Sequence, residues 1–161
     1  MASEGSGIGR AAFVEATAFR SLVGAWEWVS ARDPAAGVDR VRPREFRERS
    51  VSEIERIHAD LRAGSFRSLP LLAFQGPDGK GKIREFQIPS VRDRVVQTAL
   101  LRVLERLVAP RLSPGCHGYV RGRSTATALA HASAIIQSGA RSFLKTDIQS
   151  CFPSVDRTAL R

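Results

Sequence analysis

A strand and a helix are joined within Gly81-Lys82-Ile83-Arg84-Glu85-Phe86-Gln87-Ile88-Pro89-Ser90-Val91-Arg92-Asp93-Arg94-Val95-Val96-Gln97. Its first half is typical of a strand over 82–88, and a similar run at 71–75 lies before a glycine-rich turn. Ser90 is a good N-cap for the apolar positions that follow at helical spacing. The stretch therefore predicts a β-hairpin that leads directly into a helix over 91–108.

Three further helices are predicted by apolar residues at helical spacing. They cover residues 10–30, 51–63 and 125–138. Ser50 and Glu53 form the pattern of a capping box before the second of them. The residues expected to face the core on the four helices are Phe19, Leu22, Val23, Trp26, Val29, Ile54, Ile57, Leu61, Val95, Ala99, Val103, Leu107, Leu129, Ala132 and Ile136.

A last strand is expected over residues 143–148, near the end of the chain. With the hairpin and the helices it predicts an α+β fold. A terminal strand without a partner leaves unpaired backbone groups along its edges. We therefore expect the protein to continue beyond residue 161.

The charge balance is compatible with a nucleic-acid partner. The net charge is +9, and 22 of the 25 basic residues are arginine. The excess lies in residues 31–110, with 16 basic against 11 acidic residues, and in residues 111–161, with seven against two. Arginine presents a planar fork of donors that binds phosphate with two bonds at once. A GC-rich genome would enrich arginine equally well, so composition alone leaves both explanations open.

The remaining composition is that of a globular protein. Hydrophobic residues make up 43% of the chain and charged residues 25%. No apolar run reaches the roughly 18 residues that a membrane span needs, and the N-terminus lacks the pattern of a signal peptide. Cys116 and Cys151 have neither a close pairing nor metal-ligand spacing, so we expect free thiols and a cytoplasmic protein.

Asp147 is the first candidate for chemistry. Period-two alternation places it with Phe143 and Lys145 on one face of the expected strand, at its end. Carboxylates at such positions often hold metal ions. They also cap the turns that follow strands, and position alone favours this second explanation.

Two basic clusters are the other candidates. Lys80, Lys82 and Arg84 gather at the hairpin turn, where cations and free N–H groups suit a triphosphate or a nucleic-acid backbone, although a solvated hairpin edge looks much the same. Arg121 and Arg123 precede a helix N-terminus, which attracts phosphate. His117, in the same loop, has no acidic or nucleophilic partner nearby in the sequence and is expected to be structural.

Four blocks in order resemble the group II intron, retron and diversity-generating reverse transcriptases. Gly37-Val38-Asp39 resembles an early Gly-Val-Asp element, and residues 81–97 resemble the fingers block G-K-x-R-x-x-x-I-P-x-x-x-D-R-[IV]-[VL]-Q. Residues 117–124 are similar to Y-G-F-R-P-G-R-S, with departures at Tyr119 and Val120. Residues 145–155 resemble the first palm motif, D-I-x-x-[FC]-F-x-x-[IV]. The match covers roughly residues 37–157, and its specificity lies in the order of the four blocks.

The resemblance implies a role for each matching residue. Asp147 would be a catalytic metal ligand, Ile148 would bind metal through its carbonyl, and Phe152 would exclude a 2′-hydroxyl. Other roles implied are triphosphate binding by Arg84, Lys82 and Lys80, and nucleic-acid binding by Arg94, Arg121 and Arg123. The implied activity is RNA-directed DNA synthesis from deoxynucleoside triphosphates on an RNA template and DNA primer, with two Mg²⁺ ions.

The implied organisation is an N-terminal extension (1–30), a fingers region (31–140) and the start of a palm (141–161). The family's later Tyr-x-Asp-Asp carboxylates and its thumb lie outside this sequence. We therefore expect the chain alone to be inactive, with a further palm and thumb half as partner. The alternative is a non-catalytic RNA-binding module that keeps the fingers surface.

Overall fold

The computed structural model describes residues 2–79, 81–151, 154–156 and 158, which divide into two compact units. The first covers residues 1–111 and the second residues 112–161. In the part of the chain that the structure describes, no helix is both long enough and apolar enough to cross a membrane. Cys116 and Cys151 are free thiols, as expected.

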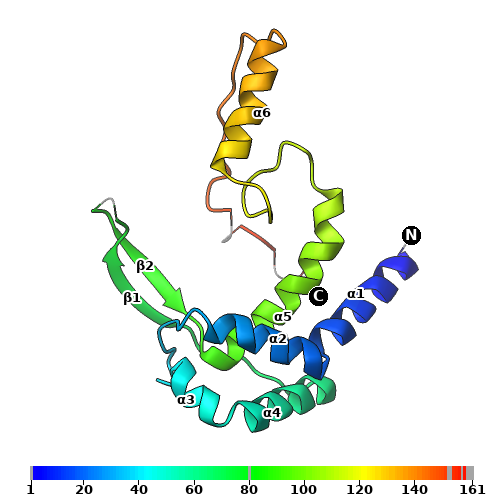
Figure 1. Cartoon of the computed structure of the whole chain (residues 1–161), viewed down its shortest axis with the longest axis vertical. Coiled ribbons are helices and arrows are strands. Elements are labelled where there is room, and N and C mark those ends of the chain that lie inside the picture. The colour runs from blue at the N-terminus through cyan, green and yellow to red at the C-terminus, as the bar shows by residue number, and fades with distance from the viewer. Residues whose placement is uncertain (1, 80, 152–153, 157, 159–161) are drawn as a thin grey trace. The chain divides into compact units, whose positions relative to one another are not determined.

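The first unit is built from helices around a single core (Figure 1). Its helices are α1 (Ala2–Thr17), α2 (Phe19–Ser30), α3 (Pro43–Glu48), α4 (Ser50–Ala63) and α5 (Val91–Val108), followed by a 3₁₀ turn, η1 (Ala109–Arg111). Helix α5 packs against α1 and α2, and α4 packs against α2. The buried core consists of Leu22, Ala25, Trp26, Val29, Phe46, Ile54, Ile57, Leu61, Val91, Val95, Val96 and Ala99. Most of the residues expected in the core of this unit are therefore confirmed.

The β-hairpin is also confirmed. Strand β1 (Leu72–Pro77) pairs antiparallel with β2 (Ile83–Ile88), in a register that runs from Leu72 opposite Ile88 to Pro77 opposite Ile83. Most of its residues are exposed. Figure 1 shows the hairpin extending away from the helices of the same unit, so the hairpin presents its side chains to solvent.

Helix α5 begins where the sequence predicts. Ser90 has extended backbone, and its Oγ accepts a hydrogen bond from the backbone N–H of Asp93 at 3.2 Å. The first N–H groups of a helix have no carbonyl acceptor within the helix, and a polar side chain in this position accepts from one of them. The predicted bounds of 91–108 agree with the helix observed.

The predicted helix over 10–30 is instead two helices. Ala18 separates α1 from α2 with extended backbone, at φ −60° and ψ 141°. The hydroxyl of Thr17 donates to the carbonyl of Phe13 at 2.8 Å, and that of Ser21 donates to the carbonyl of Glu15 at 2.7 Å. Both hydroxyls thus bond to carbonyls in the last turns of α1, next to the break.

One prediction about a helix start is wrong in this unit, and one helix was not predicted at all. Ser50 is not the N-cap of α4, because the short helix α3 ends directly before it and Arg49 takes the capping position without a side-chain bond. The hydroxyl of Ser50 donates instead to the carbonyl of Arg47. Helix α3, which the sequence pattern missed, begins with Pro43 as its first residue and is capped by Glu45, whose carboxylate accepts from Arg42 N at 2.7 Å.

The second unit contains helix α6 (Thr125–Gln137), preceded and followed by irregular segments. Ser124 caps it as predicted, accepting from the N–H of Thr127. Leu129, Ala132 and Ile136 are exposed, so the prediction that they face a core is wrong. An apolar face is buried only where another element packs on it, and α6 has none within the described part of its unit.

The predicted strand over 143–148 is not formed. These residues have irregular backbone, and Phe143, Leu144 and Ile148 are exposed. A strand is stabilised by hydrogen bonds to a neighbouring strand, and the described residues of this unit provide none. The α+β class remains a prediction for the whole protein.

Candidate functional site

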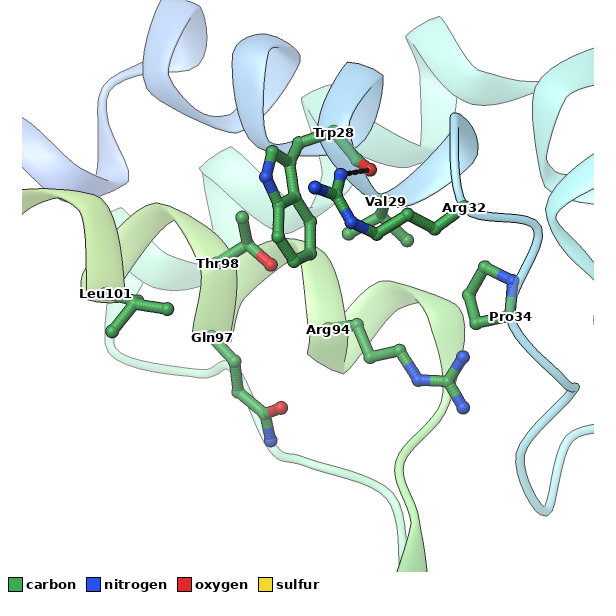
Figure 2. Close-up of a pocket in the computed structure, with 8 residues that line it drawn as sticks. All are labelled: Trp28, Val29, Arg32, Pro34, Arg94, Gln97, Thr98 and Leu101. Carbon is green, nitrogen blue, oxygen red and sulfur yellow. Dashed lines mark hydrogen bonds between the residues drawn. The ribbon is translucent and has the colours of Figure 1, made fainter. Parts of the chain in front are cut away.

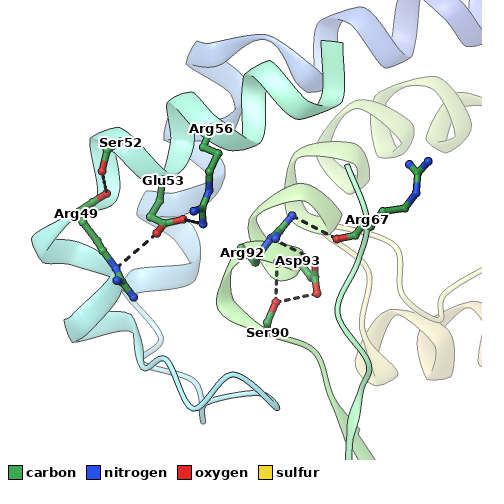
Figure 3. A network of polar contacts seen from close by, with 8 residues as sticks. All are labelled: Arg49, Ser52, Glu53, Arg56, Arg67, Ser90, Arg92 and Asp93. Atoms are coloured by element: carbon green, nitrogen blue, oxygen red, sulfur yellow. Dashed lines mark hydrogen bonds and ion pairs between the residues drawn. The ribbon is translucent and has the colours of Figure 1, made fainter. Parts of the chain in front are cut away.

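The start of α5 is fixed by a buried carboxylate, Asp93 (Figure 3). Asp93 is 3% exposed, and its Oδ2 accepts hydrogen bonds from Ser90 Oγ at 2.8 Å and from the backbone N–H of Leu69 at 3.0 Å. The carboxylate thus joins the helix to the segment that leads into β1. Asp93 of the fingers block is therefore a structural residue.

Arg92, whose side chain is 20% exposed, joins the same two segments. Its guanidinium lies over the ring of Phe66, 4.6 Å from the centroid, and donates to the carbonyl of Arg67 at 3.3 Å (Figure 3). Such cation–π pairs contribute about 0.5–1 kcal/mol at exposed positions and more where the cation is desolvated. Arg92 therefore holds the 66–67 segment against α5.

Gly37 brings the Gly-Val-Asp element onto the fingers block. A Cβ on Gly37 would lie 2.7 Å from both the Cα and the N of Ser90. Real Cβ atoms do not approach backbone this closely, so only glycine fits the observed packing. Two of the four sequence blocks are thus in contact within the first unit.

Arg94 is the partly buried cation of this region. Burial lowers the pKa of its guanidinium, and the nearby carboxylate of Asp39 acts in the opposite direction. Its Nη1 is buried and has no hydrogen-bond partner among the described residues. Asp39 of the Gly-Val-Asp element therefore supplies a negative charge near Arg94, and Nη1 of Arg94 still lacks a hydrogen-bond acceptor among the described residues.

A cavity of about 270 Å³ opens beside Arg94, between α2 and α5 (Figure 2). Its lining comprises Trp28, Val29, Arg32, Pro34, Arg94, Gln97, Thr98 and Leu101. The four residues from α5 are spaced i, i+3, i+4 and i+7, so they share one face of the helix. Sequence reasoning missed this cavity because its other wall comes from the end of α2 and the loop beyond.

The hairpin turn fixes the side chain of Arg84, one of the residues predicted to bind a triphosphate. Arg84 Nε donates to Asp78 Oδ2 at 2.7 Å, and the Arg84 side chain is 61% exposed. Asp78 Oδ1 also accepts from the backbone N–H of Lys82 at 3.1 Å. Gly79 and Gly81 both have positive φ, as a tight turn requires. Lys80, the third predicted ligand, lies outside the described residues.

The two arginines of the second unit differ in their surroundings. The guanidinium of Arg123 donates to the carbonyls of Ser113, Pro114 and Cys116, so it holds the loop that precedes α6. Arg121 is exposed and forms no hydrogen bond or ion pair with the described residues. The structure therefore gives Arg123 an internal role and leaves Arg121 open to solvent.

His117 is held by α6 rather than by an acidic partner. Its Nδ1 lies 2.9 Å from Thr127 Oγ1, and its Nε2 lies 3.1 Å from Nδ1 of His131. One imidazole of such a pair donates and the other accepts. The structural role expected for His117 agrees with this geometry, and His131 is a partner that a reader of the loop alone would miss.

Asp147 and Ile148 lie in the irregular segment after α6, and both are exposed. Phe152, the predicted gate, lies outside the described residues. Asp156 accepts from the N–H of Thr158 at 2.8 Å and from its hydroxyl at 2.6 Å. Among the residues that the structure describes, no three His, Cys, Asp or Glu side chains come together as a metal site. One carboxylate and one carbonyl fit Mg²⁺ in kind but not in number, since two ions need several carboxylates.

These features describe a basic protein with an exposed hairpin, a partly buried arginine beside a cavity and an arginine-rich loop. The family models that were compared with the chain give no match. Curated relatives do match. Over 112 residues, or 69% of the chain, it is 30% identical to the group II intron-encoded protein LtrA of Lactococcus lactis subsp. cremoris, of which it covers 18%.

Two other relatives match the chain at lower identity or over a shorter stretch. The chain is 24% identical over 102 residues, or 63% of its length, to the putative COX1/OXI3 intron 1 protein of Saccharomyces cerevisiae, of which it covers 12%. It is 35% identical over 69 residues, or 43% of its length, to protein YkfC of Escherichia coli, of which it covers 18%. The chain is thus a relative of the group II intron-encoded proteins, as its four sequence blocks predicted, and it spans less than a fifth of the length of these relatives.

Proposed function

We propose that the chain is part of an RNA-directed DNA polymerase of the group II intron kind. The observation that carries the proposal is the contact between two blocks shared with that family, where Gly37 lies against Ser90. Similarity to group II intron-encoded proteins over 69% of the chain supports it. In this proposal residues 31–140 form the fingers and residues 141–161 begin the palm of an α+β polymerase domain.

The exposed cations would bind the substrates. Arg84, oriented by Asp78 and 61% exposed, would contact the triphosphate of an incoming deoxynucleotide, together with Lys82 and Lys80. Arg94, Arg121 and the unengaged donors of Arg123 would contact the RNA template and DNA primer. Arginine suits both tasks, because its planar fork binds phosphate with two parallel hydrogen bonds.

The remaining metal ligands would come from parts of the whole protein outside this chain. Asp147 and the carbonyl of Ile148 would provide two of the oxygen ligands for Mg²⁺. Phe152 would lie beside the sugar of the incoming nucleotide and exclude its 2′-hydroxyl. The rest of the palm and the thumb would come from further sequence or from a partner chain.

A non-catalytic RNA-binding module is the second candidate. Exposed arginines such as Arg84 and Arg121 favour it equally, because they would contact RNA phosphates without any metal chemistry. Primer extension on a poly(rA) template, with an oligo(dT) primer, dTTP and Mg²⁺, distinguishes the two when the complete reading frame that contains the chain is expressed. Template-dependent synthesis supports the polymerase, and RNA binding without synthesis supports the module.

A further inference from the structure

The cavity between α2 and α5 combines an apolar wall with donors in its rim (Figure 2). Trp28, Val29, Pro34 and Leu101 supply apolar surface. The polar groups come from two arginines, Arg32 and Arg94, and from Gln97 and Thr98. An inorganic anion would make no favourable contact with the apolar wall, and a purely apolar ligand would leave the two arginines without a negative partner. The lining therefore suits a ligand with a flat apolar part and a negative charge.

The flat surface is formed by Trp28 and Arg32. The guanidinium of Arg32 lies over the indole of Trp28, 3.5 Å from the ring centroid, and donates to the Trp28 carbonyl at 2.9 Å. Trp28 keeps 41% of its surface exposed. Unpaired RNA bases stack on aromatic rings and on arginine planes of this kind. The pair thus offers a stacking platform that is already ordered by its own hydrogen bond.

The negative charge would be met by Arg94. Its Nη1 is buried without an acceptor among the described residues, and burial lowers the pKa of the group. The Arg94 guanidinium forms no hydrogen bond or ion pair with the described residues, although it lines the cavity. Nη1 itself is buried, so an anionic oxygen in the cavity would accept from the other guanidinium donors. The exposed amide of Gln97, one helical turn further along α5, adds both donors and an acceptor.

We propose that this cavity binds one unpaired nucleotide of an RNA strand, with its base against Trp28 and Arg32 and its phosphate at Arg94. The proposal rests on the proposed function only in requiring that the chain binds RNA. The volume of about 270 Å³ is close to the lower end of small-molecule sites, which run from roughly 300 Å³ upwards. One nucleotide, rather than a duplex, fits this space.

The test measures binding of a single-stranded rA octamer to the whole chain, with tryptophan fluorescence as a second readout. Arg94→Gln removes the charge inside the cavity and should weaken binding roughly ten- to a hundredfold. Gln97→Ala, at an exposed position, should also weaken it. Arg102→Gln is the matched control, since it removes the same charge from the exposed surface of α5 outside the cavity. Its affinity should stay within about threefold of that of the wild type.

Fluorescence locates the bound base. Trp28 lines the cavity, whereas Trp26 is buried against Phe46 with ring centroids 4.6 Å apart. The octamer should quench the fluorescence of the wild type, and the quenching should disappear in Trp28→Phe. AMP should bind far more weakly than the octamer. An equal affinity for AMP would overturn the assignment to an RNA strand.

The outcomes separate this inference from the proposed function. If the wild type fails to bind the octamer, RNA binding and the cavity assignment both fail. If the wild type binds while Arg94→Gln and Gln97→Ala bind equally well, only the cavity assignment is overturned. Loss of the fold is a separate cause of weak binding to be excluded, because Arg94→Gln also removes the counter-charge of Asp39. A matched melting curve checks this, and Gln97→Ala gives the answer should Arg94→Gln unfold.

Discussion

Gly37 and Ser90 are in backbone contact, so that a Cβ on Gly37 would lie 2.7 Å from the Cα and N of Ser90. The two residues are far apart in the sequence, and each belongs to a block whose sequence resembles that of reverse transcriptases. The contact explains why a glycine is needed at the first position of the Gly-Val-Asp element: a side chain there would push the loop away from the N-terminus of α5. The loop also carries Asp39, the counter-charge of Arg94.

We therefore expect Gly37→Ala to destabilise the first unit by about 1–3 kcal/mol, the usual cost of overpacking. Urea unfolding followed by circular dichroism measures the change. Gly9→Ala is the control, because a Cβ there meets nothing within 4 Å and alanine favours the helix α1. Equal stability of Gly37→Ala and wild type would show that the loop does not pack on Ser90 as described.

Asp93→Ala should cost about 2–3 kcal/mol of folding free energy, because it removes hydrogen bonds to a buried carboxylate and leaves the N–H of Leu69 unpaired. Thermal unfolding gives the difference. Glu55→Ala, an exposed carboxylate on α4, should change stability by less than about 0.5 kcal/mol. Similar melting temperatures for the two variants would argue against a structural role for Asp93.

Arg84→Ala should raise the KM for deoxynucleoside triphosphate in the whole protein by roughly ten- to a hundredfold, since a hydrogen bond from a charged donor to phosphate is lost. Its stability should change little, because the side chain is 61% exposed. Arg56→Ala is a close match as control: Arg56 is also 61% exposed and ion-paired, with Glu53 on α4. Steady-state kinetics on both variants decides, and an unchanged KM for Arg84→Ala would remove Arg84 from the nucleotide site.

RNA binding by the chain should weaken steeply as salt increases. Each phosphate contact releases condensed counterions, so the log of the affinity should fall with the log of salt at a slope of about −0.7 per contact for a single strand. Filter binding between about 50 and 200 mM salt measures the slope. Affinity that is independent of salt would contradict a phosphate-binding role for the arginines.

Local signals in the sequence predicted the first unit well. Ser90 predicted the start of α5 and Pro110 its end, and the turn residues at 76–81 predicted the hairpin. These features depend on neighbours in the chain. Ser50 with Glu53 carried an equally good local signal and failed, because α3 ends directly before Ser50 and leaves the capping position to Arg49.

Features that depend on contacts between residues far apart in the chain could not be predicted from the sequence pattern. Residues 143–148 alternate like a strand but have no neighbouring strand among the described residues. The cavity beside Arg94 needs α2 to lie against α5, and the hydrogen bond from His117 to His131 needs the loop to fold back on α6. The prediction that Asp147 is a metal ligand came only from the resemblance to a known family, because its position in the chain favoured a turn cap.

Asp147→Asn tests the polymerase assignment most directly. The complete protein that contains this chain, wild type and variant, should be compared in primer extension on poly(rA) with Mg²⁺, alongside RNA binding and melting temperature. The account predicts that Asp147→Asn abolishes DNA synthesis while RNA affinity and stability stay nearly unchanged, because Asp147 is exposed and contacts no phosphate in this proposal. Normal primer extension by Asp147→Asn would contradict the polymerase assignment.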